Sequence, residues 1–383
     1  MKKFFSLIMM SILFVSLLSA CSAKPTNQPL PQSTETPLSG SETYPAPGSP
    51  VNQPPTNPNE AYPAPAETSA PYPSPSSGAG EAYPAATQGG ESAPIPTLRM
   101  VLLPIIDNLP MYVAQQEGLF AKYGVNVAFI PVASAAERDQ VIAAGQGDGI
   151  INEIVSTILY NKDGVQVQIV RLARVPTPDS AQYHILVSGQ SGITSVEQLK
   201  GVPIGISQGT IIEYITDRLL EAEGLAPTDI KTVAVPKIPD RLALLSSGEL
   251  KAATIPDPLA YLAVQQGASF LVQDSKYPQY GHSTYAFRKP VIDQNPAAIR
   301  AFLAAIEDAI NDINADPTRW GELLKEQKLV PEALLATYQV PPFPSKSVPS
   351  EQLWADVLSW AKEKGLVSAD VSYSDSVTDQ FLP

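Results

Sequence analysis

From about residue 97 onward, strand-like and helix-like segments alternate almost without interruption. Apolar, β-branched runs at 98–103 and 125–130 are followed by helical stretches at 110–116 and 135–144, and a third apolar run occupies 149–151. Strands that alternate with helices predict mainly parallel sheets with helices on both faces. This alternation places the folded part of the chain in the α/β class.

The alternation continues through residue 165 and starts again near residue 196. It predicts further strands at 165–172, 183–187, 202–206, 232–235, 252–255, 269–272 and 283–288, and helices at 211–223, 239–247, 258–266, 296–314, 317–327 and 350–364. The chain is expected to pass from the first α/β unit to the second at the strand 183–187 and to return at the strand 283–288. We therefore expect two lobes, with 96–187 and 286–383 in lobe 1 and 188–285 in lobe 2. A cleft between them would lie at the carboxyl ends of the strands.

The segment before the alternation is rich in proline, serine and threonine. No apolar periodicity is found between residues 22 and 93, and Tyr-Pro recurs at irregular spacing, at Tyr44, Tyr62, Tyr72 and Tyr83. Such a composition cannot bury enough apolar surface to fold. Residues 21–95 are therefore expected to form a disordered, polyproline-II-like tether. A ligand for a proline-reading domain and a glycosylated stalk remain alternatives.

The first residues look like an export signal. Lys2 and Lys3 precede an apolar stretch, 4–18, which is short for a membrane span and typical of a signal peptide. Leu18-Ser19-Ala20-Cys21 resembles the bacterial lipobox. This predicts a signal peptide at 1–20 and a lipidated Cys21, carrying acyl chains such as palmitate, at the extracytoplasmic face of the cell membrane. An ordinary signal peptide with a chance cysteine is the alternative.

Charge and residue counts exclude several classes of protein. A net charge of -13 argues against nucleic-acid binding, which needs a basic surface. The single cysteine rules out an internal disulfide and a Cys-x-x-Cys site. His184 and His282 are far apart in sequence and are expected to be structural or exposed. No metal, cofactor or enzyme motif is found, so a non-enzymatic protein is expected. A monomer is also expected.

Four ordered segments resemble a known family. They are PMYVAQQEGLFAKYGV at 110–125, AAGQGD at 143–148, VEQLKG at 196–201 with IGI at 204–206, and LLSSGELKAA at 244–253. The set is similar to the solute-binding proteins of ABC importers for nitrate, alkanesulfonates, taurine or thiamine-precursor pyrimidines. Lys251-Ala252 departs from the Asp-Ala that the family usually carries there.

The resemblance implies a periplasmic-binding-protein fold of type II that closes on a small solute and then docks on an ABC permease and its ATPase. An enzymatic branch of the same superfamily uses a histidine, pyridoxal phosphate and a cysteine-rich iron motif, and this chain shows no matching set. A tethered sensor that signals to a membrane partner without transport is the alternative function, and the sequence does not separate it from a transport protein.

The candidate ligand residues lie in loops after predicted strands. Thr210 and its neighbours precede a helix, where backbone N–H groups can receive a polar or anionic group. Aspartates and threonine in such loops also serve as helix caps or turn formers. The candidates are Asp107, Asn108, Leu109, Tyr112, Asn152, Glu153, Gln208, Gly209, Thr210 and Asp257.

The side chains near the predicted strand ends give a mixed indication of the charge of the ligand. Three candidates are acidic, which favours a polar, neutral or cationic solute, heteroaromatic rings included. A nitrate or sulfonate site would instead favour arginine or clustered N–H donors. The cations nearest to strand ends are Arg171, Arg174, Lys237 and Arg241, and such residues more often form ion pairs at the rim of the cleft. Tyr112, Tyr280 and Tyr285 offer stacking faces for a ring or belong to the edge of a core.

Overall fold

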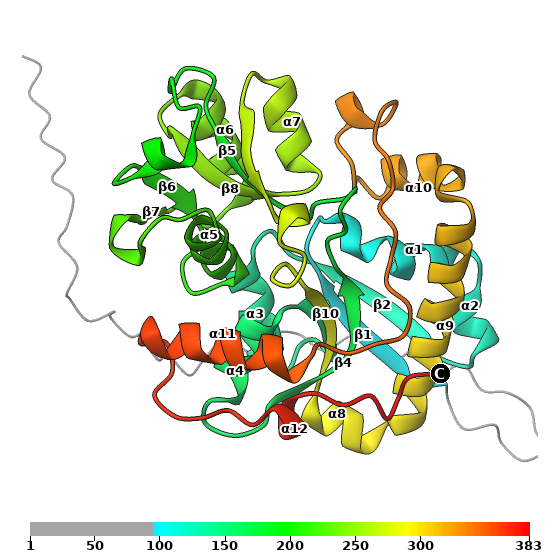
Figure 1. Cartoon of the computed structure of the whole chain (residues 1–383). Helices are drawn as coiled ribbons and strands as arrows, with labels where there is room; N and C mark the ends of the chain where they lie inside the picture. The colour runs from blue at the N-terminus through cyan, green and yellow to red at the C-terminus, as the bar shows by residue number, and fades with distance from the viewer. Residues whose placement is uncertain (1–94) are drawn as a thin grey trace, which may run out of the picture. The chain divides into compact units, whose positions relative to one another are not determined.

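The computed structural model describes residues 95–383, and it contains two five-stranded sheets (Figure 1). The predicted signal peptide, the lipidation site at Cys21 and all but the last residue of the predicted tether lie outside the described residues. The α/β fold with two lobes, one around each sheet, is confirmed.

The first sheet has the strand order β2-β1-β3-β10-β4 and the second has the order β7-β6-β8-β5-β9. In each sheet one strand runs against the other four: β10 is antiparallel to β3 and β4, and β5 is antiparallel to β8 and β9. The strands of the first sheet are β1 (Thr97–Leu102), β2 (Asn126–Pro131), β3 (Gly149–Asn152), β4 (Val167–Arg174) and β10 (Ser283–Arg288). Those of the second are β5 (Tyr183–Val187), β6 (Pro203–Ile206), β7 (Lys231–Ala234), β8 (Ala252–Pro256) and β9 (Ser269–Gln273).

The antiparallel strands are the ones that the chain enters as it passes between lobes. β5 follows the first crossing, at 175–182, and β10 follows the second, at 274–282. The structure therefore places residues 183–187 in the second sheet and 283–285 in the first, whereas the predicted boundaries assign each of these segments to the opposite lobe. Apolar alternation reveals a strand but does not reveal which sheet it pairs with.

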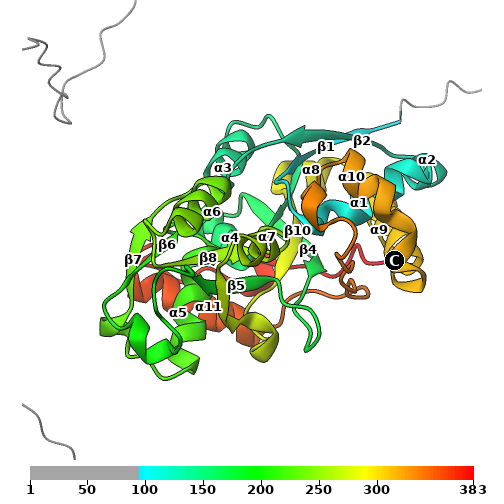
Figure 2. The ribbon, with the colours of Figure 1, turned by 90° about the horizontal axis from the view of Figure 1, so that it is seen from above.

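The helices match the predicted pattern, with additions. The first lobe carries α1 (Leu109–Gln116), α2 (Leu119–Lys122), α3 (Ala135–Ala143), α4 (Ile154–Asn161), α8 (Lys289–Gln294), α9 (Pro296–Ala315), α10 (Gly321–Glu326) and α12 (Tyr373–Ser376), and the second carries α5 (Ile211–Ala222), α6 (Ile238–Ser247) and α7 (Leu259–Gln265). α9 is the longest, and it buries one apolar face that includes Phe302 and Ile306. It packs on α1 and α2 (Figure 2).

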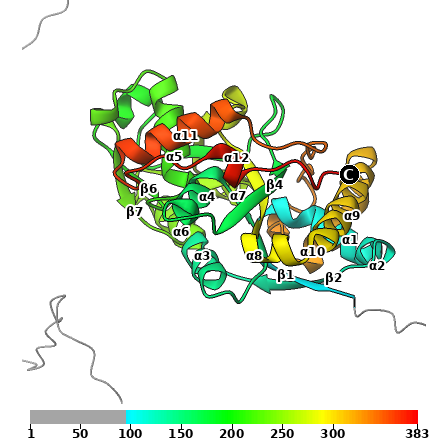
Figure 3. The same ribbon diagram turned by 90° about the horizontal axis from the view of Figure 1, so that it is seen from below.

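One helix of the C-terminal region contacts both lobes. α11 (Glu351–Glu363) begins at Ser350, whose side chain caps the first turn. It packs on α4 of the first lobe, and Trp360 Nε1 donates to the carboxylate of Asp217 on α5 at 2.8 Å. Figure 3 shows α11 alongside α4 and α5. The apolar core between these three helices is therefore shared by the two lobes.

Within residues 95–383, no helix is both long enough and apolar enough to cross a membrane.

Candidate functional site

A small cavity lies between the two lobes, where strands of both sheets end. Its volume is about 60 Å³. Segments after β1, β2 and β3 line it from the first lobe, and segments after β6, β7 and β8 line it from the second. The lining polar residues are Ser134, Arg138, Asn152, Glu153, Tyr183, Ser207, Thr210, Arg241 and Ser283, together with apolar residues that include Leu103, Ile211 and Ile238. Carboxyl ends of strands are where α/β proteins bind ligands.

Arg241 is the cation of this cavity that has no acidic partner. It lies one turn into α6, is fully buried, and is absent from every ion pair among the described residues. Its Nη1 donates to Ser207 Oγ at 2.8 Å and to the carbonyl of Val235 at 3.0 Å, while Nε and Nη2 have no acceptor within residues 95–383. Burial lowers the pKa of Arg241 to about 10, so the group stays charged at neutral pH. A buried charge with free donors is what an anion would complete.

Arg138 lines the same cavity but is fully paired. Its Nη1 lies 3.0 Å from Glu153 Oε2, its Nη2 donates to Ser156 at 2.6 Å, and its Nε contacts Asp139 at 2.8 Å. These carboxylates hold the pKa of Arg138 well above its usual range. Glu153, a predicted ligand residue, is therefore engaged as the counter-ion of Arg138.

Two further predicted residues, Asn152 and Thr210, line the cavity and already form hydrogen bonds within the protein. Asn152 Nδ2 donates to Thr157 at 2.9 Å and its Oδ1 accepts from Thr284 at 2.8 Å. Thr210 is the N-cap of α5: it accepts from the backbone N–H of Ile212 at 3.2 Å and donates to the carbonyl of Ser207 at 2.8 Å. Both residues line the inter-lobe cavity.

Of the four predicted residues between 107 and 112, Asp107, Asn108 and Leu109 are buried and Tyr112 is half-buried. Asp107 is buried and accepts from Ser283 at 2.5 Å and Gln182 at 3.0 Å. Asn108 donates to the carbonyl of Leu103, and Leu109 is fully buried at the start of α1. Tyr112 packs edge-on against Phe129 and lines a separate hollow. None of the four is among the residues that line the inter-lobe cavity.

The remaining candidates of the second lobe also lie away from the cavity lining. Gln208 is exposed, and the N–H of Gly209 donates to Glu213 at 2.7 Å, so this backbone donor already has a carboxylate. Asp257 lines a different pocket, described below. The positive φ of Gly209, 68°, explains why glycine stands at this turn before α5.

The ion pairs expected at the rim of the cleft are not found for any of the four cations. Arg171 is buried and pairs with Glu307 at 2.6 Å, and Arg174 is buried between Asp257 and Asp107. Within residues 95–383, neither Arg241, which is buried, nor Lys237, which is exposed, belongs to an ion pair. Burial of a charged side chain depends on tertiary packing, which local sequence does not reveal.

The tyrosines and the histidine considered from the sequence lie in packed positions rather than at the inter-lobe cavity. Tyr285 lies in the core against Phe302 rather than at the cleft, and Tyr280 packs against Tyr214. His184 is buried in β5 against Phe270, and burial lowers its pKa to about 3, so it is a neutral core residue. Among the described residues, no group of His, Cys, Asp and Glu is arranged to hold a metal ion.

Sequence reasoning did not select Ser134, Arg138, Tyr183, Arg241 or Ser283 as ligand residues, whereas Ser207 belongs to the loop at 207–210 that it expects at the cleft. A signal existed for Arg241, because it follows the end of a predicted strand by a few residues and begins a helix.

A protein-family model matches a large part of the chain. The description "NMT1/THI5 like" fits residues 106–319, which is more than half of the chain. The chain belongs to the NMT1/THI5-like family. The predicted resemblance is confirmed by this match.

Individual relatives of this NMT1/THI5-like protein are distant. It is 24% identical to the nitrate/nitrite binding protein NrtA of Synechocystis sp. over 251 residues, 57% of this chain and 54% of that protein. It therefore spans about half the length of that relative. It is 21% identical to a 4-amino-5-hydroxymethyl-2-methylpyrimidine phosphate synthase of Legionella pneumophila over 291 residues, 72% of this chain and 88% of the synthase.

Solved structures share the fold. The periplasmic aliphatic sulphonate binding protein SsuA of Escherichia coli superimposes with a TM-score of 0.63 at 23% identity, over 74% of this chain and 92% of SsuA. At this identity the likeness concerns the architecture alone.

Proposed function

We propose that this NMT1/THI5-like protein is the solute-binding component of an ABC importer, and that its solute carries an anionic group which pairs with Arg241 between the lobes. The observation that carries the proposal is the buried guanidinium with free Nε and Nη2 in the inter-lobe cavity. NrtA, named for nitrate and nitrite, and SsuA, named for sulphonates, support an anionic ligand.

Charge in the cavity supports the same ligand class. Arg138 and Glu153 neutralise each other, which leaves Arg241 as the net charge of the lining. The acidic residues that favoured a neutral or cationic solute do not oppose this, because Asp107 is outside the lining and Asp257 faces another pocket. We therefore replace the expected neutral or cationic solute with an anionic one.

The size of the cavity supports a mechanism by closure. A volume of about 60 Å³ holds a few water molecules or a small ion, whereas sites for larger small molecules measure about 300–1,000 Å³. The lobes must therefore separate to admit a larger solute, and closure would bring Ser207 and Arg241 of one lobe against Ser134 and Asn152 of the other.

We propose binding rather than catalysis. The chain has one cysteine, and its described histidines are both of lowered pKa, His184 in the core and His282 bonded to the carbonyl of Pro278. The synthase relative therefore points to a shared fold and not to a shared reaction.

The cellular arrangement is proposed from the sequence. Lipidation at Cys21 and the proline-rich tether would hold a monomeric binding domain at the extracytoplasmic face, within reach of a permease and ATPase. Replacing Cys21 with alanine should prevent incorporation of labelled palmitate and release the protein from the membrane fraction. Retention of both in the variant would contradict the anchor.

The test of the binding function combines thermal shift with small-angle scattering across a solute panel. Nitrate, methanesulfonate, taurine, a pyrimidine and riboflavin should be compared. An anionic solute should stabilise the chain by about 2.7 kcal/mol at a hundredfold excess over Kd and change the separation of the lobes. A panel that gives neither effect would contradict the proposal.

A further inference from the structure

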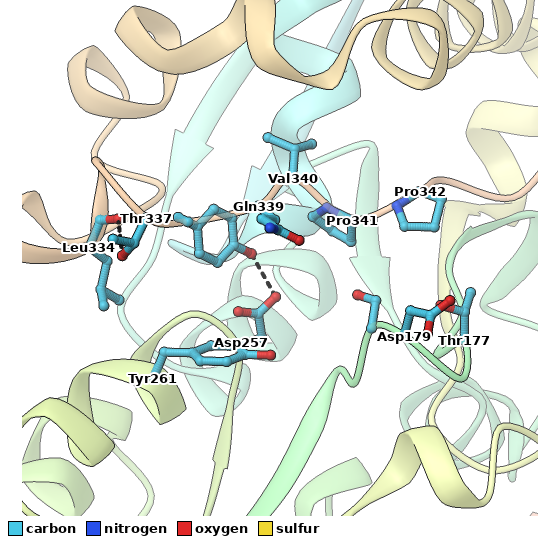
Figure 4. A pocket seen from close by; sticks show the side chains of 12 residues that line it. Thr177, Asp179, Asp257, Tyr261, Leu334, Thr337, Gln339, Val340, Pro341 and Pro342 are labelled. Carbon is cyan, nitrogen blue, oxygen red and sulfur yellow. Dashed lines mark hydrogen bonds between the residues drawn. The ribbon is translucent and has the colours of Figure 1, made fainter.

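A second pocket lies beside the first crossing between the lobes, and we call it the hinge pocket. It is lined by Thr177, Asp179 and Ser180 of the crossing, by Asp257 and Tyr261 of the second lobe, and by residues 334 and 337–342 of the first (Figure 4). Its volume of about 430 Å³ lies in the range of small-molecule sites. It shares no lining residue with the inter-lobe cavity.

The lining of the hinge pocket is acidic. Asp179 and Asp257 contribute carboxylates, and among residues 95–383 no lysine, arginine or histidine lines the pocket. Asp257 is only 3% exposed. Its Oδ2 accepts from Tyr338 at 2.7 Å and forms an ion pair with Arg174 Nη2 at 2.8 Å, whereas its Oδ1 has no hydrogen-bond partner within residues 95–383. A buried carboxylate oxygen without a donor is unfavourable, so a donor or cation placed there would be stabilised.

Arg174 does not by itself neutralise this region. Its guanidinium is shared between Asp257, at 2.8 Å, and Asp107, at 3.5 Å. A third buried carboxylate, Asp274, lies close enough to Arg174 to feel its charge, and it belongs to the second crossing. Burial raises the pKa of Asp257, an effect that the ion pair with Arg174 only partly offsets. Asp257 and Asp107 thus share one guanidinium, which leaves a negative charge that a second cation could balance.

Aromatic rings flank Asp257 in the manner that suits an organic cation. Tyr261 and Tyr338 have ring centroids 6.4 Å apart and planes inclined at 83°. Figure 4 shows Asp257 next to Tyr261, with its hydrogen bond to Tyr338 drawn. Tyrosine faces attract ammonium groups within about 6 Å, and quaternary ammonium ions are recognised in this way. Leu334, Val340 and Pro341 supply apolar contacts for methyl or methylene groups.

We propose that the hinge pocket binds an organic ammonium ion, with the free oxygen of Asp257 as its counter-charge and Tyr261 and Tyr338 around its substituents. This site is separate from the inter-lobe cavity. It goes beyond the proposed transport function, because it adds a second ligand of opposite charge that touches both lobes and the segment joining them.

The test is a calorimetric titration of the purified full chain with choline. The control ligand is 3,3-dimethyl-1-butanol, the neutral analogue of choline in which carbon replaces the ammonium nitrogen. Choline should bind at least about tenfold more tightly than dimethylbutanol. Asp257→Asn, which keeps the shape of the side chain, should weaken choline binding at least about tenfold.

Two further variants, Tyr261→Leu and Arg241→Met, test whether choline binds in the hinge pocket. Tyr261 is half-buried, and its hydroxyl forms no hydrogen bond to another side chain within residues 95–383. Tyr261→Leu should therefore also weaken choline binding if Asp257→Asn does not fold. Arg241→Met should leave choline binding unchanged, because Arg241 lines only the inter-lobe cavity. This control shows whether choline binding is independent of the proposed anion site. Equal binding of the two ligands, no binding of choline, or loss of choline binding in Arg241→Met with retention in Tyr261→Leu would overturn the proposal.

Discussion

Arg241 on α6 donates from Nη1 to the hydroxyl of Ser207, 2.8 Å away at the end of β6, and has no carboxylate partner in the described chain. Both residues belong to the second lobe, and both line the cavity that faces the first. The hydroxyl of Ser207 and the backbone carbonyls of Val235 and Pro236 orient the guanidinium and leave Nε and Nη2 without acceptors in the described chain. The site is therefore organised before the solute arrives, which reduces the ordering cost of binding.

A matched pair of substitutions tests whether Arg241 is unpaired. Arg138→Met should lower the free energy of unfolding by about 3–5 kcal/mol, because it leaves Glu153 buried without its counter-ion. Arg241→Met should change it by less than about 1 kcal/mol, because no buried carboxylate loses a partner. Urea unfolding without added solute measures both. Equal destabilisation by the two variants would show that Arg241 has an acidic partner in the resting protein.

Asp274 should make stability depend on pH. Burial raises its pKa to about 7, against about 3.9 in an unfolded chain. Because the folded state holds this proton more tightly, its contribution to stability is complete below about pH 4 and is lost as the pH rises through 7. Between about pH 5 and 8 the native chain should lose roughly 2–3 kcal/mol more than Asp274→Asn does.

The control for that comparison is Asp370→Asn, which alters an aspartate whose side chain is 86% exposed. Its unfolding free energy should follow that of the native chain at every pH. A native chain and an Asp274→Asn variant with the same pH slope would contradict the raised pKa.

Gly281 should resist substitution because it packs on Asp274. A Cβ at this position would lie 2.1 Å from Asp274 Oδ2. Gly281→Ala should therefore destabilise the fold by about 1–3 kcal/mol. Gly321→Ala is the matched control, since nothing lies within 4 Å of its Cβ position, and it should be neutral or stabilising by up to about 1 kcal/mol. Thermal unfolding of both variants measures the difference, and a neutral Gly281→Ala would argue against this packing at the second crossing.

The sequence predicts the elements of the fold well where apolar runs are long and bounded by turn residues. The strands at 183–187 and 283–288 are found at those positions as β5 and β10. Helix α4 was not predicted, although Ile154–Asn161 is apolar throughout much of its length. Buried on several sides, it lacks the alternation of polar and apolar faces that identifies a surface helix.

The site was less predictable than the fold, because its chemistry depends on which charges pair across the structure. The sequence indicates Glu153 as a ligand residue, whereas in the structure Glu153 pairs with Arg138, fifteen positions earlier. Asp257 follows β8 as expected, but its carboxylate lines the hinge pocket instead of the inter-lobe cavity. Sequence order gives the end of a strand, whereas side-chain direction and counter-ions come from long-range packing.

The most direct test of the account is a calorimetric titration of the native chain and Arg241→Met with the anionic solute that the panel identifies. The account predicts that the substitution weakens binding at least about thirtyfold, since removing one partner of a buried charge pair costs about 2–5 kcal/mol. Lys237→Met, which alters an exposed cation at the start of the same helix, should bind the solute normally. Unchanged affinity in Arg241→Met, or a preference of the native chain for an uncharged analogue of the solute, would contradict the central claim.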